Sequence, residues 1–115
     1  MQKQQVKKWR FGHFFDGRAT LVVGTHTHVP TNDCRILDNG TAYQTDAGMC
    51  GDYNSVIGMD KHNSINRFLR KNSEKHFPSN GEASLCGVIV EADSKTGLAT
   101  SVKSFIFGGD LGISK

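Results

Sequence analysis

The sequence predicts a mixed α/β fold, and three features of the chain indicate it. An amphipathic segment comes first, a short apolar run follows it, and two later pairs of strand-like segments are each joined by a turn-forming stretch. Helices and strands mixed in this way are typical of α/β and α+β domains. With 115 residues, of which 37% are hydrophobic, the chain is long enough for one modest core, so a single domain over residues 1–115 is expected.

The first element is expected to be a helix over residues 2–15. Val6 and Trp9 lie one helical turn apart and begin an apolar stripe. The pair Asp16-Gly17 then ends the helix, because glycine readily adopts the backbone angles that lead out of one.

The first strand is expected over residues 19–23, a short apolar run. The run does not alternate between apolar and polar residues, which predicts a strand buried on both faces. A hairpin follows, with strands over residues 35–37 and 41–45. The Asn39-Gly40 pair between them favours a tight reversal, because it can supply the positive φ that such a turn requires.

The rest of the chain is predicted to hold a loop, a short helix and a second hairpin. Residues 46–58 contain three glycines and no period, which indicates a structured loop. A helix is expected over residues 63–70, with its apolar side chains on one side, and the polar stretch 71–81 is expected to be a long loop. Residues 84–91 and 100–107 are apolar enough to form a pair of antiparallel strands with a turn between them.

Charge and cysteine content narrow the class of protein. The formal net charge is +3, and the basic residues cluster only near the start of the chain, at Lys3, Lys7, Lys8 and Arg10. We interpret this cluster as a solvated helix face, and stable nucleic-acid binding is not expected because no aromatic stacking platform accompanies it. The cysteines are odd in number and form no Cys-x-x-Cys pair, which predicts reduced thiols and a cytoplasmic protein. No run approaches the roughly 18 apolar residues of a membrane span, so no membrane partner is expected.

The sharpest local feature is the segment GTHTH, which places His26 and His28 directly after the first strand. In an extended backbone, residues two apart project to the same side, so both imidazoles are expected to face one site. Neutral imidazole is a common ligand of transition metals, and a two-metal centre can take one histidine on each ion. The spacing alone is a weak signal, and two loop histidines bonded to backbone or water are the alternative.

A metal centre needs further ligands, and aspartates are the candidates within the chain. A catalytic zinc takes three protein ligands, and a two-metal site takes more, including bridging carboxylates. The candidates are Asp33, Asp46 and Asp52, of which Asp46 stands out because it leaves a predicted strand into the glycine-rich loop. For each of them, capping a turn through its own backbone is an interpretation at least as strong.

Longer motifs connect the chain to a known family. Residues 16–61 contain, in order, the segments GTHTHV, GTAYQTDAGM and YNSVIGM. This stretch closely resembles the YmdB-like, calcineurin-type metallophosphoesterases, whose members share GTHTHV, GTAY-T-D-GM and YDSVIGM in that order. The similarity continues through INRFL, GEASLCGVIVEAD and TGLA and so covers most of the chain. It implies the C-terminal part of a calcineurin-like αββα sandwich, with an N-terminal helix, mixed strands and a C-terminal hairpin, as one partial domain.

The resemblance also implies an activity and a cofactor. Family members hydrolyse phosphodiesters, with 2′,3′-cyclic nucleotides as the reported substrate type, at a centre of two divalent transition-metal ions, iron or manganese. By this resemblance His26 and His28 match paired metal ligands, one on each ion. The family's other ligands, which include an Asp, a bridging Glu and an Asn-His pair, precede the matching segment in a complete member.

One loop is a candidate for substrate contact. It contains Asp52, Tyr53, Asn54 and Ser55, and Asn54 stands where the family usually has Asp. If this side chain only caps the loop, Asn serves equally well. If it bonds a substrate hydroxyl or orients a ligand, the exchange is expected to weaken turnover.

These observations favour a partial metallophosphoesterase, a C-terminal fragment that is inactive alone and whose partner is the missing N-terminal half or a second copy. Half a sandwich exposes sheet edges and faces, which predicts self-association or poor solubility. The main alternative is a non-catalytic binding or oligomerisation module that retains part of the fold. An RNA-binding domain based on the basic helix is a third, and it predicts a steep salt dependence of binding.

Overall fold

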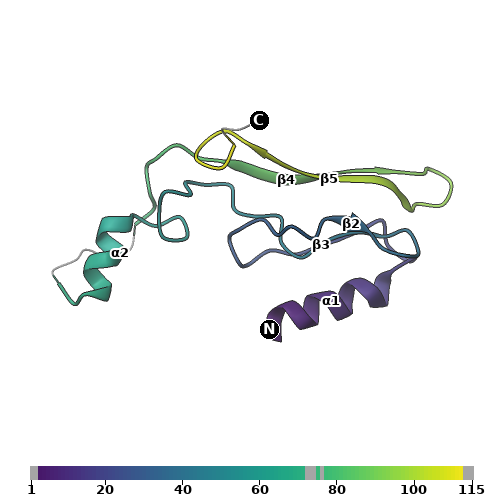
Figure 1. Ribbon diagram of the computed structural model, residues 1–115, viewed down its shortest axis with the longest axis horizontal. Coiled ribbons are helices and arrows are strands. Elements are labelled where there is room, and N and C mark those ends of the chain that lie inside the picture. The colour runs from purple at the N-terminus through teal and green to yellow at the C-terminus, as the bar shows by residue number, and fades with distance from the viewer. Residues whose placement is uncertain (1–2, 72–74, 76, 113–115) are drawn as a thin grey trace. The chain divides into compact units, whose positions relative to one another are not determined.

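The computed structural model describes residues 3–71, 75 and 77–112 of the chain. In chain order, the elements are α1 (Lys3–Phe15), β1 (Leu21–Val23), β2 (Arg35–Ile36), β3 (Ala42–Gln44), α2 (Lys61–Phe68), β4 (Leu85–Ala92) and β5 (Ala99–Phe107) (Figure 1). They confirm the predicted mixed α/β class with an N-terminal helix and a C-terminal hairpin. The chain divides into two compact units, Met1–Met49 with Cys86–Phe105 and Cys50–Leu85 with Ile106–Lys115. That residues 1–115 form a single domain stays a prediction.

The first unit contains a three-stranded sheet in the order β1-β3-β2. β1 pairs with β3 in parallel, with Leu21 opposite Ala42, whereas β2 pairs with β3 antiparallel. The turn between β2 and β3 is closed by a hydrogen bond of 3.0 Å from the Gly40 nitrogen to the Leu37 oxygen, and the φ of Gly40 is 103°. The predicted hairpin is therefore confirmed, with the glycine of the Asn-Gly pair supplying the positive φ.

Within the same unit, α1 lies on one side of this sheet and the β4–β5 hairpin lies on the other (Figure 1). The helix can approach the sheet closely because of Gly12, where an added Cβ atom would come within 2.6 Å of two ring carbons of Tyr43. The helix ends as predicted before Gly17, whose φ is 91°, and Gln2 lies outside the described residues.

β1 differs from the prediction. It was expected to be buried on both faces, yet the side chain of Val23 is 40% exposed. Among the described residues β1 has a neighbouring strand on one side only, so it forms an edge of the sheet. The prediction of a doubly buried strand is wrong because the described residues do not fully cover the faces of β1, where Leu21 and Val22 are also only half-buried.

The short helix of the second unit is shifted along the chain. α2 begins at Lys61, two residues before the expected start, because the Asp60 carboxylate caps it by accepting from the Asn63 nitrogen at 2.9 Å. It ends at Phe68, and Arg70, where the helix was expected to end, has a φ of 59° that leaves the helical conformation.

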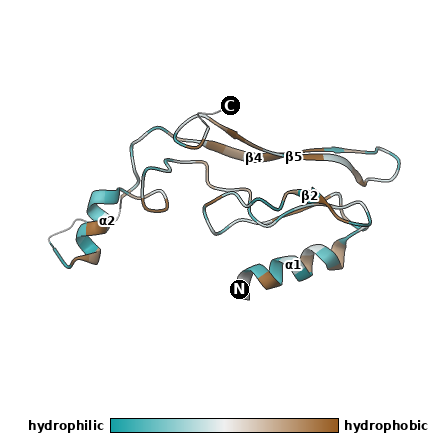
Figure 2. Cartoon of the chain, in the orientation of Figure 1, coloured by the Kyte–Doolittle hydropathy of each residue, from teal (hydrophilic) through white to brown (hydrophobic). Residues whose placement is uncertain are grey.

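Much apolar surface contacts water. Figure 2 shows hydrophobic residues along much of β4 and β5. These are the strands predicted over residues 84–91 and 100–107. In them, the side chains of Ile89 and Phe107 are 54% and 71% exposed. On the predicted apolar side of α2, Phe68 is 85% exposed. Among the described residues, the buried hydrophobic side chains are those of Leu37, Ala42, Tyr43, Cys86 and Ala99. Self-association stays a prediction, and neither described helix has the length and apolar character that crossing a membrane requires.

Candidate functional site

The two histidines of the predicted metal site lie in a bent loop after β1. The φ of His26 is 110° and that of His28 is 69°. A positive φ is uncommon outside glycine and costs about 1 to 3 kcal/mol. The expected extended backbone is therefore wrong, and a spacing of two does not by itself place the imidazoles on one side. Two strained residues so close together indicate that surrounding contacts hold this loop in place.

The carboxylate of Asp46, which is fully buried, provides those contacts. Its Oδ2 accepts from the nitrogen of Thr27 at 2.7 Å and from the Thr27 hydroxyl at 2.8 Å, and its Oδ1 accepts from the Gly48 nitrogen at 2.9 Å. The Nζ of Lys8 lies 3.8 Å from Oδ2 and donates to the Thr25 carbonyl. Burial would raise the pKa of Asp46, but these hydrogen bonds hold it below its ordinary value. Asp46 thus fixes the residue between the two histidines.

His28 carries a polar atom without a partner. Its Nδ1 is buried, and no described residue forms a hydrogen bond with it. A buried polar atom without a protein partner is rare and points to a bound ion, ligand or water. An imidazole nitrogen is a suitable donor to a transition metal, so His28 fits the predicted role, and the exposed His26 is accessible to the same chemistry. Within the described residues, no group of three His, Cys, Asp or Glu side chains could hold a metal ion.

Asp33 is engaged in a structural network. Its carboxylate accepts from the Thr31 hydroxyl at 2.7 Å, from the Thr45 nitrogen at 3.1 Å and from the Thr45 hydroxyl. The Tyr43 hydroxyl and the Trp9 indole nitrogen lie 3.0 and 3.1 Å from the same Thr45 hydroxyl oxygen. Burial would raise the pKa of Asp33, yet the hydrogen bonds from Thr45 and Thr31 hold it below its ordinary value. The network connects α1 to the end of β3.

The candidate substrate loop belongs to the second unit. The buried carboxylate of Asp52 accepts from the Ser79 hydroxyl and, at 2.8 Å, from the Asn54 nitrogen. The bond from Ser79 is the main cause that lowers the pKa of Asp52. The Ser55 hydroxyl donates to the Asp52 carbonyl and accepts from the Gly58 nitrogen at 2.8 Å. Asp52 therefore caps its own loop, as the alternative interpretation held.

Asn54 and Tyr53 are more accessible than Asp52. Asn54 is exposed, and its Oδ1 accepts from the Nζ of Lys61 at 3.0 Å, while Tyr53 is half-buried. An aspartate at this position would form an ion pair with Lys61. Asn54 keeps the hydrogen bond to Lys61, but its neutral amide does not balance the positive charge of Lys61. A substrate role for this loop stays a prediction.

Sequence reasoning missed the side chains that hold the loops. Four such side chains bond the aspartates or the histidine loop, those of Lys8, Thr27, Thr45 and Ser79. Three of these contacts join residues far apart in the chain: Lys8 and Thr25 are 17 positions apart, Thr27 and Asp46 are 19 apart, and Ser79 and Asp52 are 27 apart. No local pattern marks a threonine or serine for such a role.

Comparison with known proteins identifies the family of the chain. A model described as YmdB-like protein matches residues 3–105. The chain belongs to the YmdB-like family. It is 41% identical over 104 residues to the 2′,3′-cyclic-nucleotide 2′-phosphodiesterase of Bacillus subtilis (strain 168), a match that covers 90% of this chain and 39% of that protein. It is 43% identical over 98 residues to a Mycoplasma genitalium protein whose name is that of a phosphatase/phosphodiesterase, covering 84% of this chain and 35% of that one.

Two crystal structures are similar to this chain. A hypothetical protein from Thermus thermophilus has a TM-score of 0.80 and 35% identity, covering 90% of this chain and 40% of that chain. A phosphatase from Mycoplasma pneumoniae has a TM-score of 0.81 and 39% identity, covering 90% and 37%. The chain thus spans less than half the length of these relatives. In the Bacillus subtilis and Mycoplasma genitalium proteins it matches the C-terminal part.

Proposed function

We propose that this chain contributes the loop of His26 and His28 to a metal-dependent phosphodiesterase that acts on 2′,3′-cyclic nucleotides. The buried, unpartnered Nδ1 of His28 is the single observation that supports this most directly. The positive φ of both histidines adds to it, because strain of this kind gathers at functional sites. The substrate class follows the name of the Bacillus subtilis relative.

In this proposal, His26 and His28 hold two divalent transition-metal ions, iron or manganese, together with ligands from outside the described residues. Such ions act as Lewis acids on phosphoryl oxygens. The work of this chain is to hold the two imidazoles still. Asp46 does so by bonding the backbone and the hydroxyl of Thr27, which lies between them.

The acidic ligands would come from outside the described residues. Asp33, Asp46 and Asp52 already accept several hydrogen bonds each, so they are poor sources of metal-binding oxygens. Two cations near one another repel strongly without anionic ligands between them. We therefore propose that these residues are inactive by themselves and act together with the N-terminal half of a YmdB-like protein, because a second copy would bring the same engaged aspartates. The proposal also places the chain in the cytoplasm, as the cysteine pattern predicts.

Hydrolysis of a 2′,3′-cyclic nucleotide with added Mn²⁺ or Fe²⁺ tests the proposal. The chain is assayed alone and together with a polypeptide that carries the remaining family ligands. Turnover is expected only in the mixture, and His26→Ala or His28→Ala should each reduce it by about 100-fold or more. The matched control is His62→Ala, which alters an exposed histidine of α2 and should leave turnover unchanged.

Two outcomes count against the proposal. Turnover that survives both substitutions would exclude these histidines as metal ligands. No turnover with any metal, in a mixture that does form a complex, would favour the non-catalytic module. That alternative has one observation in its favour, because the three candidate aspartates serve the fold.

A further inference from the structure

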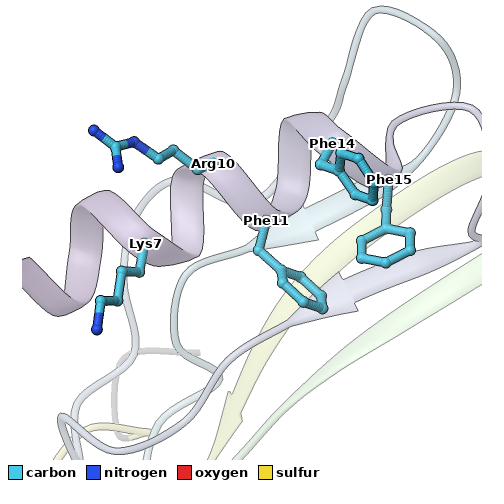
Figure 3. A pocket seen from close by; sticks show the side chains of 5 residues that line it. All are labelled: Lys7, Arg10, Phe11, Phe14 and Phe15. Carbon is cyan, nitrogen blue, oxygen red and sulfur yellow. The ribbon is translucent and has the colours of Figure 1, made fainter.

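The basic residues of α1 do not share one environment. Figure 3 shows the side chains of Lys7 and Arg10 extending from the helix, with their charged ends apart from the labelled phenylalanine rings. Both residues are exposed. The side chain of Lys8 is only 19% exposed, and its ammonium group bonds another segment of the first unit. Lys8 is thus set apart from the solvated face that the basic cluster was predicted to form.

Lys8 bonds the loop that carries His26. Its Nζ donates to the carbonyl oxygen of Thr25 and lies 3.8 Å from Oδ2 of Asp46. The same Oδ2 accepts from the backbone nitrogen of Thr27 at 2.7 Å. The peptide groups on both sides of His26 are therefore fixed, the one before it by Lys8 and the one after it by Asp46.

These two peptide groups determine the conformation of His26. Each peptide group is planar, so the φ and ψ of a residue describe how the groups before and after it are rotated. His26 cannot relax from its φ of 110° without moving a peptide group that a charged side chain holds. A strained residue persists only where its surroundings determine its conformation. Lys8 and Asp46 together provide those surroundings.

An ammonium group suits this position. It has three N–H donors, so it can bond the Thr25 carbonyl and still direct an N–H at Asp46. The side chain of Asp46 is 1% exposed, and a buried carboxylate is costly without a balancing charge. A neutral amide at position 8 could donate to the carbonyl but would not balance that charge.

The stem of Lys8 has room because of Gly24. A Cβ atom added at Gly24 would lie 3.1 and 3.2 Å from Cδ and Cε of Lys8, which is tighter than ordinary contacts. The first residue of the GTHTH segment thus leaves space for the side chain that reaches the loop from α1.

We propose that Lys8 is a positioning residue for His26. It acts from α1 through the Thr25 carbonyl and the Asp46 carboxylate, and it touches neither metal nor substrate. The role of His26 as a metal ligand rests on the proposed function, but the hold on the loop needs no bound ion.

Nuclear magnetic resonance of the metal-free chain tests this hold. Lys8→Met keeps most of the stem and removes the ammonium group. It should speed hydrogen exchange at the Thr27 amide by at least about tenfold and shift the imidazole signals of His26. Lys8→Arg keeps a cationic donor and should bring exchange back to within about threefold of the unmodified chain. Lys7→Met is the matched control at the neighbouring exposed lysine and should change neither signal.

A variant that is only less stable should not give this pattern. Gly12→Ala acts on the same unit through Tyr43, and it should leave the imidazole signals of His26 in place. If circular dichroism shows that Lys8→Met does not fold, Lys8→Gln replaces it, because glutamine is also uncharged and is one bond shorter. Unchanged exchange at Thr27 and unchanged His26 signals in a folded, uncharged variant would overturn the proposal.

Turnover in the mixture with the remaining family ligands gives a second readout. Lys8→Met should raise the Mn²⁺ concentration needed for half-maximal turnover by about 10- to 100-fold, because a loosely held ligand binds the ion less tightly. Additional Mn²⁺ should recover part of the lost turnover, since both imidazoles are still present. His26→Ala should not be recovered in this way, and Lys7→Met should follow the unmodified chain.

The two readouts separate the role of Lys8 from the proposed function. A mixture without turnover, in a chain where Lys8→Met still loosens Thr27 and shifts the His26 signals, would refute the proposed function alone. Turnover of the unmodified mixture, with the same Mn²⁺ dependence in Lys8→Met, would refute the role of Lys8 alone.

Discussion

Asp33, Asp46 and Asp52 illustrate how a carboxylate near a candidate site can serve the fold. Each accepts hydrogen bonds from the backbone and from a threonine or serine hydroxyl of another segment. An ionised carboxylate accepts several such bonds at once, and each is stronger than a bond between neutral groups. At the residue scale, these side chains determine how the loops around the histidines and around Asn54 are held.

Asp46→Asn is expected to lower the free energy of unfolding by about 2 to 4 kcal/mol. The carboxylate accepts a backbone hydrogen bond at each of its two oxygens, from the N–H groups of Thr27 and Gly48. An amide has only one accepting oxygen, so its NH₂ group would face one of these N–H groups. Urea unfolding followed by circular dichroism measures the change. Asp93→Asn is the control, because Asp93 accepts from Lys95 in an exposed turn and should lose less than about 1 kcal/mol. Equal losses would contradict the role assigned to Asp46.

At the scale of elements, close packing and a helix cap set where the two helices lie. Gly12 lets α1 approach the ring of Tyr43, and Asp60 determines the start of α2. The close packing of α1 depends on the absence of a Cβ atom at Gly12, and the start of α2 depends on the carboxylate of Asp60. Each can therefore be tested by a single substitution.

Gly12→Ala is expected to destabilise the first unit by about 1 to 3 kcal/mol, although alanine favours a helix over glycine by about 1 kcal/mol. The added Cβ would lie 2.6 Å from the Tyr43 ring, which is buried and has little room to move. His13→Ala, at an exposed position of the same helix, should change stability by less than about 0.5 kcal/mol. Thermal unfolding compares the two, and a stabilised Gly12→Ala variant would show that α1 is not packed as described.

Asp60→Ala is expected to cost about 1 kcal/mol and to fray the first turn of α2. The Asn63 nitrogen would lose its acceptor at 2.9 Å. Amide hydrogen exchange measures this locally, and faster exchange at Asn63 with unchanged exchange in β3 is the expected result. Protection that stays the same at Asn63 would mean that the cap does not hold the helix.

At the scale of the whole molecule, a small buried core stands beside a large exposed apolar area. The fully buried side chains include polar ones, among them Thr41, Gln44 and Asp46. Hydrogen bonds to carboxylates thus contribute to the stability of both units. Stability that depends on ionised carboxylates depends on pH.

Acid is therefore expected to destabilise the chain. The pKa values of Asp33, Asp46 and Asp52 lie below the ordinary value of 3.8 in the folded state. The unfolded chain binds protons first as the pH falls, so their contribution is present above about pH 4 and is lost as the pH drops through the folded pKa values. Urea unfolding over that range measures it, and Asp46→Asn should reduce the slope. A flat profile below about pH 4 would rule out this source of stability.

The sequence by itself determined the order and type of the elements and the family. The Asn39-Gly40 turn, the apolar strands of the second hairpin and the GTHTHV motif are contiguous patterns, and local backbone preferences act over such short distances. The start of α2 at Lys61 could also have been predicted from the sequence, because Asp60 is a typical capping residue and lies three positions before Asn63.

Only the tertiary structure decided the edge position of β1, the positive φ of His26 and His28 and the roles of the three aspartates. These depend on contacts between residues far apart in the chain, such as Thr27 with Asp46 and Asp52 with Ser79. A side chain's partner across such a distance is set by how the elements pack, and no spacing within the sequence encodes it.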